Sequence, residues 1–413
     1  MPSYAAFIGH QPHLSLAELA ATVPGFLLHE KINHSVVLFD SGVPLDAKFM
    51  DTLGGTIVLA EKLEDAKART EDIPEILGKL LMPIKGKVTF SLRTLGFAPG
   101  TVRDFYRKSK LHLKKKGKPS RYVGNERVAA PSIVLRDNGL LDRSHGCELC
   151  VIQHAAEAST SPLLWIGITV GAQDVDAYTK RDMEKPVRDT SVGLLPPKLA
   201  QILVNFGVWL AKKNQSPGPM VILDPFCGTG VIPMECLMRG FTALASDKSE
   251  KAITGTTKNL EWLRKQFEIS KTKAPSRVWK QDATKPFDAK AHPELAKGVD
   301  AIVTETTLGP ALTKRPTMKE VNTLRSDNEA LQIGFLESAA ASLPGVPIVC
   351  IWPVWYPSKA PVALEKVWKA AEKLGYQAVL PPTIEIVDGR MSLLYRRPDQ
   401  FVGREVVIFK AKK

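Results

Sequence analysis

The chain has 413 residues, a hydrophobic content of 44% and a formal net charge of +13. This length predicts two or three domains, and no apolar run reaches the ~18 residues that a membrane-spanning helix needs. Residues 1–15 lack a basic stretch followed by an apolar one, so we expect no secretory signal. The odd number of cysteines, five, is typical of a protein in the reducing cytoplasm. The positive charge favours a polyanionic partner, for which nucleic acid is the first expectation.

Residues 1–85 have the pattern of a small α/β module. Strands are expected over residues 4–9, 36–39 and 55–60, and helices over residues 16–21 and 73–81. Ser15 is predicted to cap the first of these helices, because Glu18 follows it at the spacing of a capping box.

Residues 86–172 are predicted to form a second module, of α+β type, which begins with a strand and a long basic helix. The helix is expected over residues 101–116, and the strands over residues 87–92, 132–135, 147–153 and 163–170. Between residues 101 and 121, Asp104 is opposed by nine basic residues: Arg103, Arg107, Lys108, Lys110, Lys114, Lys115, Lys116, Lys118 and Arg121. A merely solvated helix face would carry charges of both signs. We therefore favour contact with RNA or DNA, in which each neutralised phosphate adds salt-sensitive affinity.

Cys147 and Cys150 form a C-x-x-C pattern inside the predicted strand over residues 147–153. No second cysteine pair or nearby histidine pair completes a zinc site, and cysteine is a good small core residue. We therefore favour a structural role for these cysteines over a metal or redox role, and we predict no metal site.

Residues 173–196 are polar, carry charges of both signs and are predicted to be a linker that docks on the residues after it. From residue 197 onward strands and helices alternate, which predicts a largely parallel sheet with helices on both faces. Helices are expected over residues 198–204, 231–238, 251–267, 326–343 and 361–374. Strands are expected over residues 221–223, 241–245, 277–281, 300–304, 347–352, 383–387 and 403–409.

Residues 221–247 predict a nucleotide-cofactor site, because a strand, a glycine turn, a helix and a second strand follow one another. Asp247 ends the second strand, close to the spacing at which a carboxylate can bind a ribose diol. A dinucleotide site would prefer a third glycine, and Asp224 before the turn would repel a pyrophosphate. The acid suits a ligand with a cationic end, such as the ammonium group of S-adenosylmethionine. A glycine turn in an unrelated α/β protein is the alternative.

Four acids follow successive predicted strands of this region. Asp224, Asp247, Asp282 and Glu305 stand at the carboxyl ends of these strands. Ligands of such sheets bind at this edge, so the four acids predict one composite site.

At these residues the chain resembles the archaeal and eukaryotic tRNA N2-guanosine methyltransferases that act near nucleotide 10 and carry an N-terminal THUMP RNA-binding region. The resemblance rests on residues 7–9, 14–19, 178–182, 185–189, 193–200, 224–230 and 395–405. It implies an α/β protein whose C-terminal domain, residues 197–413, is a Rossmann-like class I methyltransferase. The domains before it would be a small α/β module at 1–85, a THUMP-like α+β domain at 86–172 and a linker at 173–196.

The resemblance also implies where S-adenosylmethionine binds. The methionine part would be held by Asp224 and the glycines of the turn, the ribose by Asp247, and the adenine by Asp282. The full set implied is Asp224, Cys227, Gly228, Gly230, Asp247, Lys248, Asp282 and Ala283.

The catalytic motif departs from the family pattern. Where the family has Asp-Pro-Pro-aromatic, this chain has Glu305-Thr306-Thr307-Leu308, so Glu305, Thr306 and Thr307 are the catalytic candidates. Because a shift of about 1 Å in a reacting group can cost about 100-fold in rate, conventional activity does not follow automatically. Trp352, Trp355 and Tyr356 are equally compatible with a substitute stacking surface for the base and with core packing.

The first hypothesis is a cytoplasmic tRNA methyltransferase that transfers a methyl group from S-adenosylmethionine to the exocyclic N2 of a guanosine. Alternatives are an RNA-binding protein with a silent site, and an amino-methyltransferase acting on another nucleic-acid base or on a protein glutamine. The sequence leaves open which nucleotide is modified and whether one or two methyl groups are added. It also leaves open the oligomeric state and the need for a small activating subunit.

Overall fold

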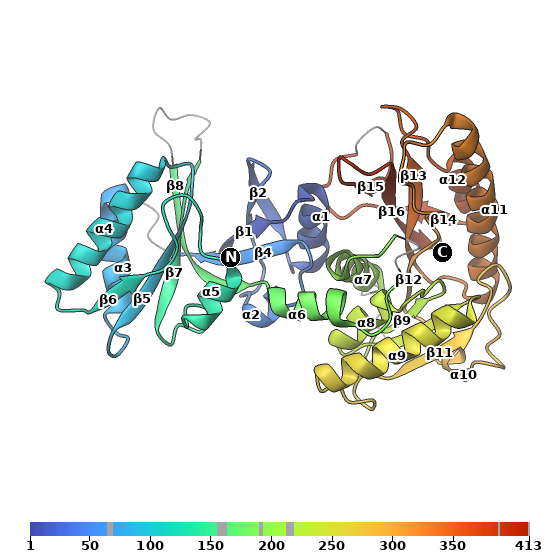
Figure 1. Ribbon diagram of the computed structural model, residues 1–413, viewed down its shortest axis with the longest axis horizontal. Coiled ribbons are helices and arrows are strands. Elements are labelled where there is room, and N and C mark those ends of the chain that lie inside the picture. Colours follow the sequence, from blue (N-terminus) through green and yellow to red (C-terminus); the bar gives the residue numbers. More distant parts are fainter. Residues whose placement is uncertain (64–68, 155–162, 190–192, 212–218, 387–388, 412–413) are drawn as a thin grey trace. The chain divides into compact units, whose positions relative to one another are not determined.

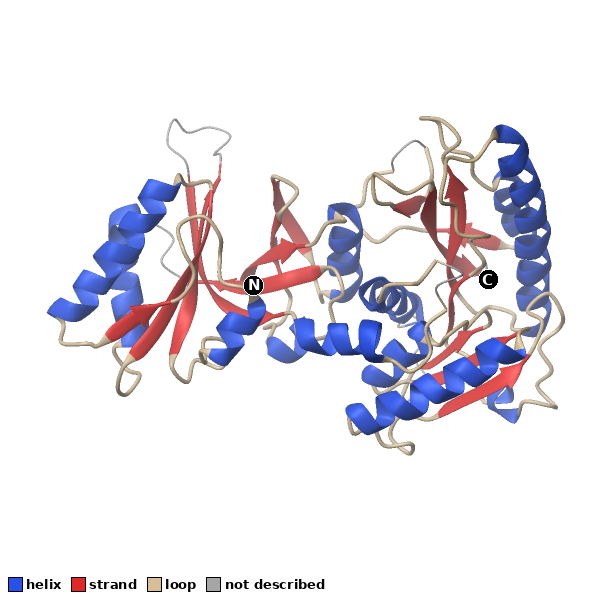
Figure 2. Ribbon diagram, viewed as in Figure 1, coloured by secondary structure: helices blue, strands red, loops and turns tan. Residues whose placement is uncertain are grey.

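The computed structural model describes residues 1–413 except 64–68, 155–162, 190–192, 212–218, 387–388 and 412–413 (Figure 1). The chain divides into two compact units, one of residues 1–12 and 23–177 and one of residues 13–22 and 178–413. Each unit is built on a β-sheet with helices packed against it (Figure 2). In the described part of the chain, no helix combines the length and the apolar character that crossing a bilayer requires.

The first unit has one sheet in the order β2-β3-β1-β4-β8-β7-β5-β6. Its strands are β1 (Ser3–Ile8), β2 (Leu27–Ile32), β3 (Val36–Asp40), β4 (Thr56–Lys62), β5 (Val88–Leu95), β6 (Ser120–Tyr122), β7 (Gly146–His154) and β8 (Leu163–Ala172). Its helices are α2 (Ala47–Met50), α3 (Ile73–Leu81), α4 (Pro99–Lys115) and α5 (Ser132–Asp137), with a 3-10 turn at Thr70–Asp72. The modules expected at 1–85 and 86–172 share this sheet, because β4 pairs with β8 along its length.

The second unit has a sheet in the order β11-β10-β9-β12-β13-β16-β14, with β15 paired to β16. Its strands are β9 (Val221–Asp224), β10 (Thr242–Asp247), β11 (Ser276–Lys280), β12 (Ala301–Glu305), β13 (Ile348–Trp355), β14 (Tyr376–Ala378), β15 (Ser392–Tyr395) and β16 (Val402–Ala411). Strands β9 to β13 are mutually parallel and β16 is antiparallel. This is the Rossmann-like, doubly wound arrangement that the alternating pattern predicts.

Helices cover both faces of the second sheet. They are α1 (Pro12–Thr22), α7 (Pro197–Ala211), α8 (Val231–Met238), α9 (Glu250–Gln266), α10 (Pro293–Ala296), α11 (Met318–Ser342) and α12 (Glu365–Lys373). Alternate residues of β9 point to opposite faces. Ile222 therefore belongs to the core formed with α7, α8 and α9, whereas Leu223 belongs to the core formed with α11 and α12.

The segment predicted as a linker divides between the two units, and its part from Tyr178 onward packs within the second unit through a buried ion pair. It contains α6 (Val175–Thr179) and a π-helical turn at Lys180–Glu184. Nε of Arg181 donates to Oε1 of Glu235 on α8 at 2.7 Å, with both side chains buried. The Arg181 guanidinium also lies 4.4 Å from the ring centroid of Tyr178. Breaking such a buried pair by replacing one partner would leave an uncompensated charge.

Several predicted elements are wrong. Residues 132–135 belong to a helix, α5, because Pro131 precedes it and the buried Ser132 and Leu135 are one helical turn apart. The first helix begins at Pro12 rather than after Ser15, so Ser15 is a buried residue inside the helix. Residues 383–386 form no strand, and residue 387 lies outside the described residues.

Cys147 and Cys150 confirm the structural interpretation of the C-x-x-C pattern. Both are buried and unoxidised on β7. Because they are three residues apart on a strand, they face opposite sides of the sheet. Cys147 packs in the core that contains α3 and α4, and Cys150 packs in the core on the other face. Burial raises the pKa of the Cys147 thiol to about 12, which keeps it protonated and unreactive.

Candidate active site in the second unit

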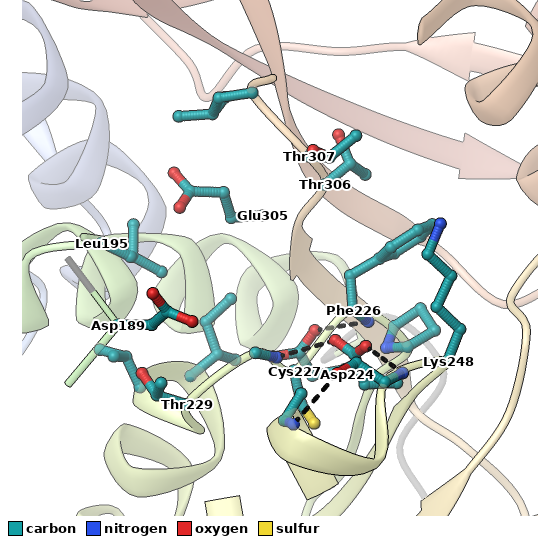
Figure 3. A pocket seen from close by; sticks show the side chains of 18 of the residues that line it. Asp189, Leu195, Asp224, Phe226, Cys227, Thr229, Lys248, Glu305, Thr306 and Thr307 are labelled. Carbon is teal, nitrogen blue, oxygen red and sulfur yellow. Dashed lines mark hydrogen bonds between the residues drawn. The ribbon is translucent and has the colours of Figure 1, made fainter. Parts of the chain in front are cut away.

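A cavity of about 400 Å³ lies at the carboxyl edge of the second sheet (Figure 3). The predicted residues that line it are Asp224, Cys227, Gly228, Asp247, Lys248, Asp282, Ala283, Glu305, Thr306 and Thr307. Figure 3 shows Glu305, Thr306 and Thr307 on one side and Asp224, Cys227 and Lys248 on the other. Parallel strands bring their carboxyl ends to one edge, which explains why residues far apart in sequence converge here.

The glycine turn between β9 and α8 leaves open space beside its backbone. Gly228 has a φ of +52°, and a Cβ atom added to it would meet nothing within 4 Å. Gly230 has a φ of +84°, and a Cβ there would lie 2.9 Å from the side chain of Thr256 on α9. Gly230 is not among the residues that line the cavity. Its place is the entry into α8, where only glycine combines this backbone conformation with the close approach to α9.

Asp224 is a buried carboxylate at the end of β9. Its Oδ1 accepts hydrogen bonds from the Thr304 hydroxyl at 2.6 Å and from the backbone N–H of Phe226 at 3.2 Å. Burial raises the pKa of Asp224 to about 7, with smaller contributions from the charges of Asp247 and Glu305. A cation bound next to Asp224 would stabilise the ionised form.

Asp247 and Asp282 accept hydrogen bonds that fix the orientation of their carboxylates. Oδ2 of Asp247 accepts from the N–H of Gly228 at 3.1 Å, and Oδ1 accepts from the N–H of Ser249 at 2.9 Å. Each carboxylate oxygen has more than one acceptor position, so Asp247 can still bind two hydroxyl groups. Oδ1 of Asp282 accepts from the N–H and the hydroxyl of Thr284, and these bonds lower the pKa of Asp282.

Glu305 forms a buried ion pair with Arg404, which comes from the antiparallel strand β16. Nε of Arg404 donates to Oε1 of Glu305 at 2.6 Å, and Nη2 donates to the carbonyl of Leu194 at 3.1 Å. Their side chains are 12% and 7% exposed. Burial raises the pKa of Glu305, and the Arg404 guanidinium opposes that rise. The sequence placed Arg404 only within the C-terminal family signature, and nothing in the local pattern showed its contact with Glu305.

The two threonines after Glu305 differ in their availability. Thr306 is buried, and its hydroxyl donates to the carbonyl of Ile351 at 2.8 Å and accepts from Nε2 of Gln332 at 2.5 Å. Thr307 is exposed, and its hydroxyl accepts from the N–H of Gly309 at 3.3 Å. Thr306 therefore supports the loop, while Thr307 is accessible to a substrate.

The aromatic residues Trp352 and Trp355 on β13, and Tyr356 directly after it, do not provide a stacking surface beside the cavity. Trp352 and Trp355 are fully buried, and the Trp352 ring packs against Trp368 and Phe409. Tyr356 is also buried, with the Arg396 guanidinium 3.8 Å from its ring centroid. The core interpretation of these residues is confirmed. Phe226, two residues after Asp224 in the glycine turn, lines the cavity instead.

The linker supplies cavity residues that were missed as site residues. Val187, Arg188 and Asp189 line the cavity. The side chain of Asn259 on α9 holds this segment, because its Oδ1 accepts from the N–H of Val187 and its Nδ2 donates to the carbonyl of Val187, both at 2.9 Å. Asp189 forms an ion pair with Lys251 at 2.9 Å. Only the family motif at 185–189 carried a signal for this wall.

The predicted RNA-binding residues lie in the first unit, on α4 and the residues after it. Eight of the nine are exposed, the exception being Lys118. The Lys118 ammonium donates to backbone carbonyls of Met82 and Ile84, so it is structural. Arg103 is paired with Glu126, and Arg107 with Asp104. The cationic surface is therefore carried mainly by the exposed lysines of α4 and by Lys116.

Comparison with known proteins places the chain in a family. No family model matches it. Over 160 residues, which are 38% of this chain and 38% of the relative, it is 29% identical to a tRNA (guanine(10)-N2)-dimethyltransferase of Methanothermobacter thermautotrophicus. Over 124 residues, which are 30% of this chain and 68% of the relative, it is 30% identical to a "probable tRNA (guanine(10)-N2)-dimethyltransferase" of Methanothermococcus thermolithotrophicus. The chain belongs to this family of tRNA methyltransferases.

The match to the Methanothermobacter member of the family spans less than half of that protein's length. Among solved structures, TrmN from Thermus thermophilus has a TM-score of 0.49 and 16% sequence identity, with the whole of both chains covered.

Proposed function

We propose that this protein is a tRNA methyltransferase that transfers a methyl group from S-adenosylmethionine to the exocyclic N2 of a guanosine. The observation that carries the proposal is the cavity in which Asp224, Asp247, Asp282 and Glu305 converge, in a chain of the tRNA methyltransferase family. Acids at the ends of neighbouring strands can serve one ligand with several polar groups.

The residues of the cavity fit the parts of S-adenosylmethionine. Asp224 would pair with its ammonium group, whose charge would favour the ionised form that burial disfavours in the ligand-free protein. The open space at Gly228 leaves room for the methionine part. Asp247 would bind the ribose hydroxyls, and Asp282 with Ala283 would border the adenine. The bound cofactor would supply a methyl group activated by its sulfonium.

Glu305 would act on the acceptor amine. The lone pair of an exocyclic guanine amine is conjugated with the ring, so a carboxylate that accepts its hydrogen bond favours the attacking geometry. Arg404 holds one oxygen of Glu305 and leaves the other for this contact. Thr307, exposed at the same loop, can add a further polar contact.

The first unit would bind the tRNA. Its exposed lysines on α4 can neutralise phosphates, and we assign residues 86–172 as the THUMP-like domain on the strength of the family resemblance. In this arrangement the cationic surface holds the RNA and the second unit carries out the reaction.

The test is methyl transfer to mixed tRNA, followed by nucleoside mass spectrometry. We expect N2-methylguanosine or N2,N2-dimethylguanosine with the native chain. Glu305→Ala should abolish the product while the cofactor still binds in a calorimetric titration. A product methylated on another base would overturn the assignment of the acceptor, and unchanged turnover by Glu305→Ala would overturn its catalytic role.

A second candidate is an RNA-binding protein with a silent site, and two observations favour it. The Glu305 charge is already neutralised by Arg404, and the Thr306 hydroxyl is already engaged as donor and acceptor. In this case tRNA would bind and no tRNA would be labelled, even with the cofactor bound.

A further inference from the structure

Three loops meet at the carboxyl edge of the second sheet. The first of them carries Thr306 and Thr307, and we call the side of the cavity formed by Glu305 and these threonines the acceptor side. The first, residues 306–317, follows β12 and leads into α11. The second, residues 356–364, follows β13, and the third, residues 396–401, leads into β16. Because Trp355 on β13 pairs with Val402 on β16, the second loop leaves the sheet at the point where the third loop enters it. We call these loops, with residues 318 and 319 at the start of α11, the acceptor rim.

The acceptor rim is strongly cationic. It contains one acid, Asp399, and six basic residues: Lys314, Arg315, Lys319, Lys359, Arg396 and Arg397. All of these basic residues except Arg396 are exposed. In the described part of the chain, none of these exposed five has a carboxylate within ion-pair distance. For the cations of the first loop and Lys319, the nearest acid along the chain is Glu320, which instead accepts the N–H and hydroxyl of Thr317 in a helix cap.

Contacts between cations and rings hold the rim loops together. The Arg315 guanidinium of the first loop lies 5.8 Å from the ring centroid of Phe401 in the third. Arg396 of the third loop lies 3.8 Å from the ring centroid of Tyr356 in the second, and donates to the carbonyls of Gln400 and Pro398. Arg396 uses its N–H donors within the third loop and acts as a brace, whereas Arg397 beside it stays exposed. The cations are therefore presented on a braced surface rather than on separate loops.

The acceptor rim begins at the catalytic candidates. Thr307, Leu308 and Gly309 line the cavity, and Lys314 and Arg315 follow within the same loop. A nucleotide inserted into the cavity from this side would bring its neighbouring phosphates to the rim. Lysine and arginine neutralise phosphates with salt-sensitive affinity, and arginine recognises them through paired N–H donors.

We infer that the acceptor rim binds the phosphate backbone of the RNA segment that carries the target nucleotide. This inference rests on the proposed function, because the cavity must accept a base from RNA. It assigns two RNA contacts to the chain, one on α4 of the first unit and one on the rim of the second. The rim would set which nucleotide enters the cavity, and α4 would add affinity through the first unit.

The test compares two variants with equal charge changes. The rim variant is Lys314→Glu/Lys319→Glu/Arg397→Glu, which leaves the bracing residues Arg315 and Arg396 in place, and the control variant is Lys271→Glu/Lys273→Glu/Lys297→Glu. The control lysines are exposed and lie before β11 and β12, at the amino edge of the same sheet. Both variants should keep the native circular dichroism spectrum and unfolding temperature, because all six side chains are on the surface.

We measure tRNA binding by fluorescence anisotropy over a range of salt concentrations. The rim variant should bind tRNA about tenfold or more weakly than the control variant at about 100 mM salt. It should also lower the slope of log K against log salt by about 3, one for each lost phosphate contact. Cofactor binding, measured by calorimetry, should be unchanged in both variants.

The outcomes separate the inference from the proposed function. Equal tRNA affinity and salt slope in the two variants would overturn the inference, even if the native chain methylates tRNA. A native chain that binds tRNA through the rim but labels no nucleoside would overturn the proposed reaction and support the rim. Loss of binding to an acidic protein but not to tRNA would show that the rim serves a protein partner, and would also overturn the inference.

Discussion

We expect Arg404→Met to shift the pH dependence of methyl transfer to higher pH while the cofactor still binds. Methionine keeps the apolar stem of Arg404 and removes the guanidinium that pairs with Glu305 at 2.6 Å. Burial already raises the pKa of Glu305, and Arg404 opposes that rise. Without Arg404 the pKa of Glu305 rises further, so the carboxylate needed to accept the amine hydrogen bond forms only at higher pH.

The size of the effect follows from the burial of this ion pair. The Glu305 side chain is 12% exposed, so solvent screens the charge only weakly. Removing one partner of a buried pair typically costs about 3–5 kcal/mol, and each 1.36 kcal/mol corresponds to roughly a tenfold change in the ionised population. We therefore expect kcat near neutral pH to fall by roughly 100-fold or more, with partial recovery as the pH is raised.

The assay is kcat at saturating tRNA and cofactor between about pH 5 and about pH 9. Arg404→Lys should keep more of the native profile, because it keeps a charge next to Glu305. Glu305→Gln should give low activity that depends little on pH. If Arg404→Met has the native profile, Arg404 does not tune Glu305 and the reasoning is wrong.

Stability gives an independent readout of the same charge. An acid with a raised pKa in the folded state destabilises the fold once the pH exceeds its unfolded value. Arg404→Met should therefore lose more free energy of unfolding at about pH 8 than at about pH 5. The double variant Glu305→Gln/Arg404→Met removes the unpaired carboxylate and should recover part of this loss.

Two further predictions concern the cofactor and the RNA. Because the pKa of Asp224 is about 7, cofactor affinity should rise through about pH 7 and then level off, whereas Asp224→Asn should bind weakly at every pH. Asp224→Asn should also raise the free energy of unfolding of the ligand-free protein above about pH 7 by up to about 4 kcal/mol, since burial of this acid destabilises the fold there. Calorimetry measures the cofactor affinity, and urea unfolding measures the free energy of unfolding. A native cofactor affinity that does not change with pH would contradict the role given to Asp224. Replacing the three lysines at 114–116 by glutamate should lower the salt slope of tRNA binding by about 3. The double variant Lys48→Glu/Lys62→Glu is the control on the same unit, and an equal loss per charge there would argue against a defined site on α4.

Local patterns were sufficient for most elements of the second unit. The helix expected over 231–238 is α8, and the strands on either side of it are β9 and β10. The glycine turn and the apolar runs are encoded by neighbouring residues, so the sequence shows them directly. Where local signals conflict, the prediction failed. Residues 133–135 are β-branched or apolar, yet Pro131 and the burial of Ser132 and Leu135 on one face favour the helix α5.

The sequence by itself determined the acids at the strand ends, the glycine turn and the basic stretch around α4, because each depends on residue type and short spacing. Only the tertiary structure decided that Arg404 pairs with Glu305, that the linker forms a cavity wall, and that Trp352 and Trp355 belong to the core. It also placed residues 13–22 in the second unit, where Nδ2 of Asn205 donates to Glu18 at 2.6 Å. The physical reason is distance along the chain. Glu305 and Arg404 are 99 residues apart, and the order of strands in the sheet, which local propensity does not specify, brings them together.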